Sequence, residues 1–166
     1  DHSGTSLTTG VQNTLIGGAA GDALTDADFN VAVGKSALSS DTLGSTSTAI
    51  GHSTLAVQNF TTATNSYNTA VGFSAGNVVT TGTVNTFVGA LSGDALTVGH
   101  HNTAVGMQAL TSDTQGSNSI AIGSFALNSQ NFTTATDSHN TAVGYSAGSA
   151  VTTGIKNTLI GGLAAD

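Results

Sequence analysis

The side chains of this protein that are suited to catalysis or metal binding are serines, histidines and aspartates, because it contains no cysteine and no glutamate. Nucleophilic catalysis by serine needs a histidine and an acid beside it, and glycoside hydrolysis needs a pair of carboxylates. No such set is singled out by an unusual local sequence. We therefore expect no enzyme activity and no cofactor.

The five histidines and the densest group of aspartates are the remaining candidates for a metal site. The histidines lack the spacing of a zinc site. They are His2, His52, His100, His101 and His139. Asp22, Asp26 and Asp28 supply the carboxylate oxygens that calcium prefers, but not at the spacing of the calcium-binding nonapeptides of secreted β-rolls, and Val98 stands 72 positions after Asp26. We therefore expect surface turns and no metal site at these positions.

The 166-residue chain is poor in charge and rich in small polar residues. Charged side chains make up 7% of it, whereas Thr, Ser and Asn together supply more than a third of it and Gly occupies 22 positions. With two lysines, no arginine and a net charge of −7, it lacks the cations that neutralise nucleic-acid phosphates. It is also poor in strong helix formers, and no stretch approaches the ~20 apolar residues of a membrane span. We predict a β-rich chain with no nucleic-acid partner and no membrane contact.

A repeated motif sets the organisation of the chain. The motif is Asn-Thr-Ala-Val-Gly, with similar variants, and the intervals between its copies are 17, 17, 21, 17, 17, 17, 21 and 17. Its glycines are Gly17, Gly34, Gly51, Gly72, Gly89, Gly106, Gly123, Gly144 and Gly161. At a longer period of 72, 53 of 94 comparable pairs are identical. We assign a single repeat domain, 1–166, with super-repeats over about 1–72 and 73–144 and a partial one over 145–166, and interpret it as a fragment of a longer fibrous protein.

Each repeat unit is predicted to form one rung of a parallel β-solenoid. A β-prone motif is followed by a turn-prone polar stretch, such as residues 111–116, and so short a unit buries its apolar face only by stacking on its neighbours. Rungs stack ~4.8 Å apart, so nine of them give a rod about 40 Å long. The predicted fold class is all-β, a β-roll with 17-residue rungs and one 21-residue rung in each super-repeat.

Two columns of repeated residues are predicted to be structural. The first opens the motif, with serine at positions 47 and 119, and we expect its stacked amides to hydrogen-bond from rung to rung. Its asparagines are Asn13, Asn30, Asn68, Asn85, Asn102, Asn140 and Asn157. The second column is the nine motif glycines, which we expect to adopt a positive φ or to permit close approach of neighbouring backbones.

Alternation along the motif strand places Thr and Val on one face and Asn, Ala and Gly on the other. We predict that the Val or Ile column, from Ile16 to Ile160, is interior. The Ala column is also apolar, with larger residues at Leu15, Phe87 and Leu159, and strands with two apolar faces are usually covered on both sides. A 17-residue rung has room for one narrow core. We therefore expect the second face to pack against other copies in a homotrimer; a single-chain solenoid with a small exposed face is the alternative.

The 21-residue rung carries a four-residue insertion whose sequence recurs, since residues 58–64 are identical to residues 130–136. Insertions in repeat proteins go to loops on one face, which is often the binding face. The candidate binding residues are Asn59, Phe60, Thr61, Thr62, Asn131, Phe132, Thr133 and Thr134. The alternative is that the two phenylalanines fold back onto the core.

Residues 119–127 and 140–148, which begin Ser-Ile-Ala-Ile-Gly and Asn-Thr-Ala-Val-Gly, resemble the head repeats of trimeric autotransporter adhesins. Together with the Thr-Gly turns at 81–82 and 153–154, they are also similar to segments of phage tail fibres. The resemblance covers nearly all of the chain. It implies a left-handed parallel β-roll of three closely packed chains on a bacterial surface or a virion. The regular four-residue insertion departs from the adhesin head.

The leading functional hypothesis is an extracellular adhesive fibre segment. It would hold identical side-chain rows outward, so that weak contacts with a host surface or receptor add up. A structural filament subunit is one alternative. An ice-binding solenoid is another, although its threonine column is broken by Val31 and Ile120 and shares a face with the valines that we expect in the core. The threonines of that column are Thr14, Thr48, Thr69, Thr86, Thr103, Thr141 and Thr158.

Overall fold

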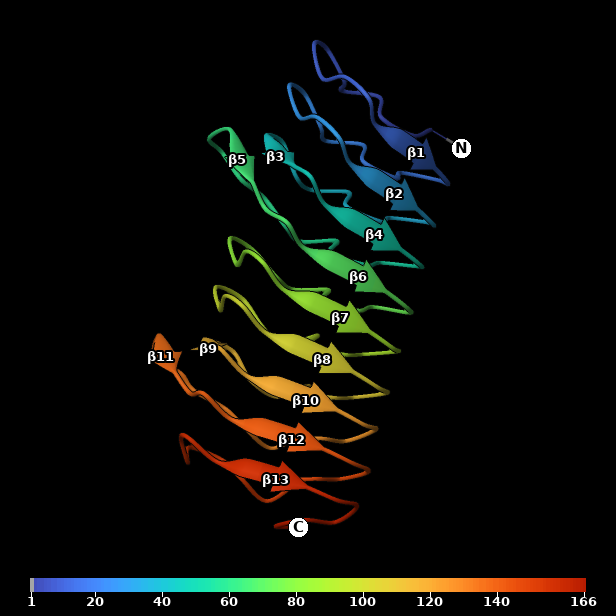
Figure 1. Ribbon diagram of the computed structural model, residues 1–166. Coiled ribbons are helices and arrows are strands. Elements are labelled where there is room, and N and C mark those ends of the chain that lie inside the picture. Colours follow the sequence, from blue (N-terminus) through green and yellow to red (C-terminus); the bar gives the residue numbers. More distant parts are fainter. Residues whose placement is uncertain (1) are drawn as a thin grey trace.

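The computed structural model describes residues 2–166 as a rod of stacked rungs, with the two ends of the chain at opposite ends of the rod (Figure 1). Within these residues the regular structure consists of short strands, without helices. The strands are β1 (Thr14–Ile16), β2 (Val31–Val33), β3 (Gly44–Ser45), β4 (Thr48–Ile50), β5 (Thr64–Asn65), β6 (Thr69–Val71), β7 (Thr86–Val88), β8 (Thr103–Val105), β9 (Gly116–Ser117), β10 (Ile120–Ile122), β11 (Thr136–Asp137), β12 (Thr141–Val143) and β13 (Thr158–Ile160).

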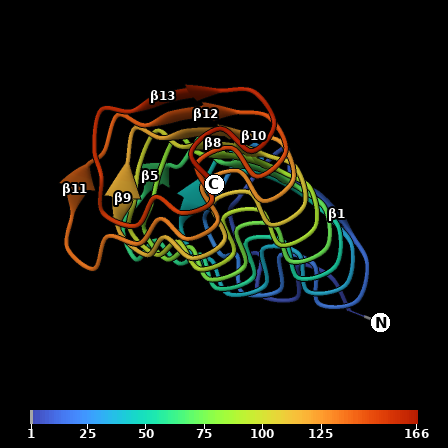
Figure 2. The ribbon, with the colours of Figure 1, turned by 90° about the horizontal axis from the view of Figure 1, so that it is seen from below.

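The motif strands form one parallel sheet that runs the length of the rod. Its order is β1-β2-β4-β6-β7-β8-β10-β12-β13, and every strand pairs with the next without a shift, so that Ala32 lies beside Ala49 and Ala49 beside Ala70. The register is kept across each 21-residue rung, where the pairs β3-β5 and β9-β11 form small separate sheets. Figure 2 shows the rungs superimposed along the rod. The predicted all-β parallel solenoid with 17-residue spacing is confirmed.

The prediction that the Val or Ile column is interior is wrong. The middle residue of each motif strand points inward, and Ala32, Ala49 and Ala70 are fully buried. The Val or Ile column points outward, with Val88 37% and Ile122 39% exposed. The expectation that the Ala face packs against another chain is therefore also wrong. We call the outward face, made of the first and third residues of the nine motif strands, the Thr–Val face.

The size of the rung explains why alanine is inside. Leucines from the opposite wall, such as Leu38 and Leu110, are fully buried in the same core and leave space only for a methyl group on the strand. Where a large residue replaces the strand alanine, the opposite wall carries glycine. A Cβ atom on Gly76 or Gly93 would lie 2.7 or 2.3 Å from the ring of Phe87, which is closer than packed atoms allow.

The motif glycines form a seam in which both expected properties occur together. All nine have φ between +121° and +141°, where a residue without Cβ is favoured. A Cβ atom on Gly51 would lie 2.1 Å from the carbonyl oxygen of Gly72 on the next rung. The seam therefore requires glycine both for its backbone conformation and for the close stacking of the rungs.

Candidate functional site

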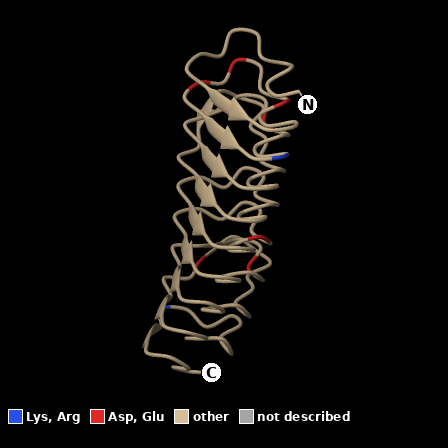
Figure 3. Ribbon diagram, turned by 90° about the vertical axis from the view of Figure 1, so that its right-hand side faces the viewer, with Lys and Arg blue, Asp and Glu red and all other residues tan. Residues whose placement is uncertain are grey.

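The Thr–Val face is a regular surface that follows the nine-stranded sheet along the rod. Nine strands with two outward positions each give eighteen positions, which hold only Thr, Val and Ile. They are partly or well exposed along the whole sheet. Charged residues are sparse along the rod (Figure 3), and none lies among these eighteen positions. The face is an uncharged, largely apolar strip about 40 Å long.

The asparagine ladder lies inside the rung, directly behind this face. Each side chain bridges two rungs: Asn30 Nδ2 donates to the carbonyl oxygen of Gly44 (2.9 Å), and Asn30 Oδ1 accepts from the backbone N–H of Ser47 (2.8 Å). Direct contacts between amides are few, one being Asn85 Nδ2 to Asn68 Oδ1 at 3.3 Å. The ladder is thus mainly a chain of side-chain to backbone bonds that fixes the start of every motif strand.

A buried polar network holds the first insertion loop. Asp41 accepts from the backbone N–H of Phe60 (2.9 Å) and from Gln58 Nε2 (2.6 Å). Gln58 Nε2 also donates to Ser47 Oγ (2.8 Å), and Gln58 Oε1 accepts from Asn68 Nδ2 (2.8 Å). The side chains of Asp41, Gln58, Ser47 and Asn68 are fully buried. The network takes the place of apolar packing at this point of the core, where the longer rung forms a loop with four extra residues.

The second loop repeats this network. Gln130 Nε2 donates to Asp113 Oδ2 (2.6 Å) and to Ser119 Oγ (2.9 Å), and Asn140 Nδ2 donates to Gln130 Oε1 (2.7 Å). The two loops protrude from the same side of the rod, beside β5 and β11 (Figure 2). They are therefore two copies of one structure, four rungs or ~20 Å apart.

The structure divides the candidate binding residues of the loops into two groups. Phe60 and Phe132 are 6% exposed and pack inward, as the alternative interpretation expected. Asn59 and Asn131 accept hydrogen bonds from threonines of the preceding rung. The side chains that remain free to meet a partner are the exposed threonines, Thr61, Thr62, Thr133 and Thr134.

A second line of exposed and half-exposed side chains was not found from the sequence. It consists of the residue just before each ladder position, and we call it the corner ridge because it runs where the loop side meets the Thr–Val face. Its residues are Gln12, Phe29, Thr46, Tyr67, Val84, His101, Asn118, His139 and Lys156. All nine have positive φ, between 50° and 64°. The sequence signal that would have revealed it is the column of aromatic residues preceding the motif.

The other border of the Thr–Val face also carries aromatic side chains. The rings of His52 and Phe73 stack with centroids 5.4 Å apart and an interplanar angle of 15°. Tyr145 meets Phe125 edge to face at 6.0 Å. Phe73 and Tyr145 are both more than half exposed, so aromatic surface borders the Thr–Val face on both sides.

The aspartates of the first rungs accept hydrogen bonds from residues of the neighbouring rung. Asp26 accepts from Thr9 Oγ1 (2.6 Å), and Asp28 Oδ1 accepts from the backbone N–H of Val11 (2.7 Å). Asp22 accepts from the hydroxyl of Thr5, and this hydrogen bond lowers the pKa of Asp22. Residues 2–166 contain no group of three or more potential metal ligands.

His100 has a structural role near the ridge. Its Nδ1 accepts a hydrogen bond from the backbone N–H of Thr83 at 3.0 Å. On the next rung Ser117 occupies the equivalent position, and its Oγ accepts from the backbone N–H of His100. Partial burial, and to a smaller extent the neighbouring His101, hold the pKa of His100 below its ordinary value. The histidine is therefore neutral near pH 7 and acts as a hydrogen-bond acceptor.

The described part of the chain presents surfaces and no cavities. No pocket opens anywhere in residues 2–166, and no helix there has the length and apolarity needed to span a bilayer. Every buried side-chain nitrogen or oxygen in this part has a hydrogen-bond partner. Comparison with protein-family models, with curated proteins and with solved structures found no match.

Proposed function

We propose that this chain is a segment of an extracellular attachment fibre, an adhesin head or phage tail fibre displayed on a bacterial surface or a virion, and that it acts without catalysis. The observation that carries the proposal is a stiff rod of parallel rungs with an exposed, uncharged strip, the Thr–Val face, that can join such rods side by side. Contiguous exposed apolar surface of this kind marks an interaction site. A rod that repeats its side chains on every rung suits attachment through many weak contacts.

The Thr–Val face is proposed to join three copies of the chain. The three strand residues and one neighbour on each side span ~17 Å, and with a length of ~40 Å they cover roughly 700 Å². Stable interfaces bury about 800 Å² per partner, whereas a trimer divides this strip between two neighbouring copies, roughly 350 Å² for each. The apolar character of the strip, and not its area, therefore supports assembly. Parallel rods also place equal rungs side by side, which brings apolar columns together without burying charge.

Sedimentation equilibrium of the wild type and of Val88→Lys tests the assembly. The wild type is expected at three times the chain mass, and Val88→Lys at a lower mass, because lysine would be buried without a partner. Val57→Lys is the matched control, since Val57 is similarly exposed but lies off the Thr–Val face. A folded wild type of single-chain mass at micromolar concentration would contradict the trimer.

Attachment is tested separately with fluorescently labelled protein on panels of bacterial and animal cells. Saturable retention that unlabelled protein displaces is the expected result. Absence of saturable binding on every surface, together with long filaments in electron micrographs, would favour the structural filament subunit instead.

One observation also supports ice binding as a second candidate function. The threonine column and the Val or Ile column point outward together, in equal steps of ~4.8 Å. The objection that the threonines share a face with buried valines is therefore removed. Thermal hysteresis at micromolar concentration by a single-chain species would support it. A trimer without thermal hysteresis would exclude it, because the same face cannot bind both ice and other copies.

A further inference from the structure

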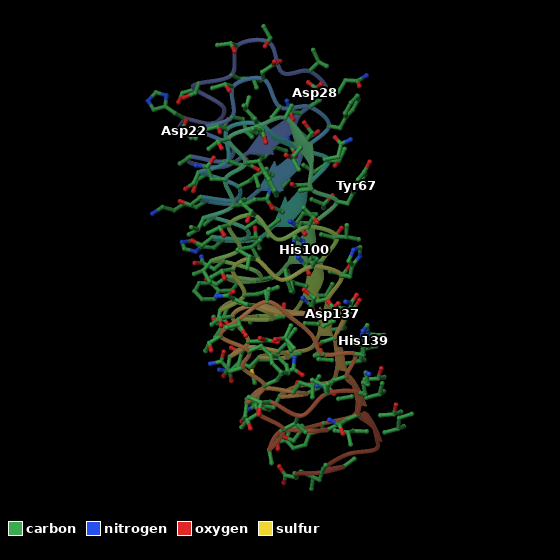
Figure 4. The ribbon with its side chains drawn as sticks, turned by 90° about the vertical axis from the view of Figure 1, so that its left-hand side faces the viewer. Asp22, Asp28, Tyr67, His100, Asp137 and His139 are labelled. Atoms are coloured by element: carbon green, nitrogen blue, oxygen red, sulfur yellow. The ribbon has the colours of Figure 1, made fainter. Side chains whose placement is uncertain are left out.

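Aromatic rings recur along the corner ridge with a period of two rungs. They belong to Phe29, Tyr67, His101 and His139, and all four are exposed. The pairings of β2 through β12 hold these residues at one register, so neighbouring rings are ~10 Å apart. Figure 4 shows Tyr67 and His139 pointing outward along the same edge of the rod.

The backbone under these rings is fixed. All four residues have φ between 50° and 59°. The N–H of Phe29 donates to the carbonyl oxygen of Val11, and that of His101 to Thr83, each at 3.1 Å. A backbone so constrained loses little conformational entropy when a ligand binds, while each exposed ring keeps its side-chain rotation. The ridge is thus a line of rings attached at preorganised backbone positions.

The two loops that flank the ridge differ only in what they expose. Residues 58–67 and 130–139 are identical except at two positions, where Asn65 and Tyr67 correspond to Asp137 and His139. All four of these side chains are exposed, while the serine between each pair is buried. The two changes between the loops thus both fall on exposed side chains, while the buried residues that build the loop are kept, as in binding sites carried on a rigid scaffold.

From these features we propose that the corner ridge binds an extended, uncharged, β-linked polysaccharide, with its sugar rings against Phe29, Tyr67, His101 and His139. This inference rests on the proposed attachment function and names the ligand class. The C–H faces of pyranose rings pack on aromatic rings. Asn65 and the exposed loop threonines offer neutral donors and acceptors for sugar hydroxyls.

The period of the ridge selects the form of the ligand. A β-1,4-linked chain repeats after two sugars, over a length close to two rungs, so every second ring presents the same face to the protein. An α-linked chain of the same sugar coils and cannot follow a straight ridge. The repeat of the protein and the repeat of the ligand therefore agree only for the extended chain.

The charge and the width of the corner ridge disfavour polyanions and proteins as its partners. Lys156 is the single cation on the ridge and the chain carries a net charge of −7, which disfavours polyanions. The ridge is one side chain wide and alternates its rings with residues such as Thr46 and Asn118. The area of so narrow a strip is far below the ~800 Å² per partner that a protein interface buries.

Calorimetric titration with cellohexaose, and with maltohexaose as the α-linked control, tests the proposal. The wild type is expected to bind cellohexaose alone, equally at low and high salt. Phe29→Ala and Tyr67→Ala are each expected to raise its Kd about three- to tenfold. Phe73→Ala is the matched control, because Phe73 is as exposed as Tyr67 but lies on the other border of the Thr–Val face; its Kd is expected to equal that of the wild type.

A swap variant tests the spacing itself. Tyr67→Val with Val84→Tyr keeps the number of rings but moves one of them by a rung, and is expected to bind as weakly as Tyr67→Ala. Equal binding by the swap variant and the wild type would overturn the role of the period.

Three results would overturn the proposal. They are no binding of cellohexaose at millimolar concentration, equal weakening by Phe73→Ala, and salt-sensitive binding of polylysine in place of cellohexaose, which would assign the ridge to a cationic partner. Sedimentation of each variant separates this proposal from the trimer. A trimer that binds no glycan refutes only the ridge, and a single chain that binds cellohexaose refutes only the assembly.

Discussion

At the scale of single residues, the rod accepts backbone strain at regular positions. The corner ridge places non-glycine residues in the left-handed region on every rung, where asparagine is tolerated and β-branched residues are disfavoured. Asn118 and Val84 occupy equivalent places with φ of 61° and 59°. The left-handed backbone therefore does not by itself decide which residue occupies each ridge position.

Val84→Asn is predicted to stabilise the protein by about 1 kcal/mol, because it removes a β-branched side chain from a left-handed position. Val84 is exposed, so little packing is lost. The measurement is the midpoint of guanidinium unfolding. Val88→Asn, in an extended strand, serves as the control and is expected to lower the midpoint; an unchanged or lower midpoint for Val84→Asn would refute strain at this site.

His100 is predicted to make stability depend on pH. Its pKa in the folded state is lowered, so below the ordinary histidine pKa of about 6.5 the unfolded chain binds the proton more readily. The contribution of His100 is thus complete above that pH and is lost as the pH falls toward the folded-state pKa. Serine is the residue type found at the equivalent position one rung later. His100→Ser is expected to make the unfolding midpoint change less between pH 7.5 and 5 than it does in the wild type. Identical pH profiles would contradict this role.

At the scale of elements, the insertion loop is held by the buried Asp–Gln network, to which the loop itself contributes Gln58 in one copy and Gln130 in the other. Asp41 and Asp113 are fully buried carboxylates, each held by a glutamine side chain and by the backbone N–H of a loop phenylalanine. Buried polar groups are retained only where their hydrogen bonds are complete. The loop and the core are therefore one cooperative unit.

Gln58→Leu is predicted to destabilise the protein by about 2–3 kcal/mol, because it leaves Asp41 Oδ2 buried without its donor. Gln130→Leu is expected to lower the free energy of unfolding by the same amount, because the two glutamines make equivalent hydrogen bonds. Gln130 Nε2 donates to its aspartate and serine at 2.6 Å and 2.9 Å, and Gln58 Nε2 donates to its own at 2.6 Å and 2.8 Å. The sites are four rungs apart, so the double variant is expected to show the sum of the two effects. Thermal or chemical unfolding measures all three; a leucine that is tolerated at either site would contradict the account.

At the scale of the whole molecule, the rod is a sum of rungs and of the contacts between neighbouring rungs. Each motif strand pairs only with the strands before and after it. Stability in such a protein grows with the number of rungs and does not depend on a central nucleus. Adding or removing one complete super-repeat is therefore expected to change the length of the rod without changing its register.

Deletion of residues 73–144, one complete super-repeat, is predicted to leave a shorter folded rod. It joins Gly72 to Tyr145, which preserves the step from a motif glycine to its neighbour in both sequence and register. The far-UV circular dichroism per residue is expected to be unchanged and the unfolding midpoint lower. Deletion of residues 73–136 breaks the register and is expected to abolish cooperative unfolding; equal behaviour of the two deletions would refute the modular rod.

The sequence by itself determined the rung, its length, the alternation of the motif strand and the two longer rungs, because these follow from period and from local preference. It could not decide which face is inside. Val and Ala columns are both apolar, and valine is the more hydrophobic, yet Ala49 is buried and Ile50 is exposed.

That choice belongs to the tertiary structure, because the space left inside a rung depends on the leucines of the opposite wall. The same holds for the corner ridge, whose rings are distant in sequence and become a line only when the rungs stack.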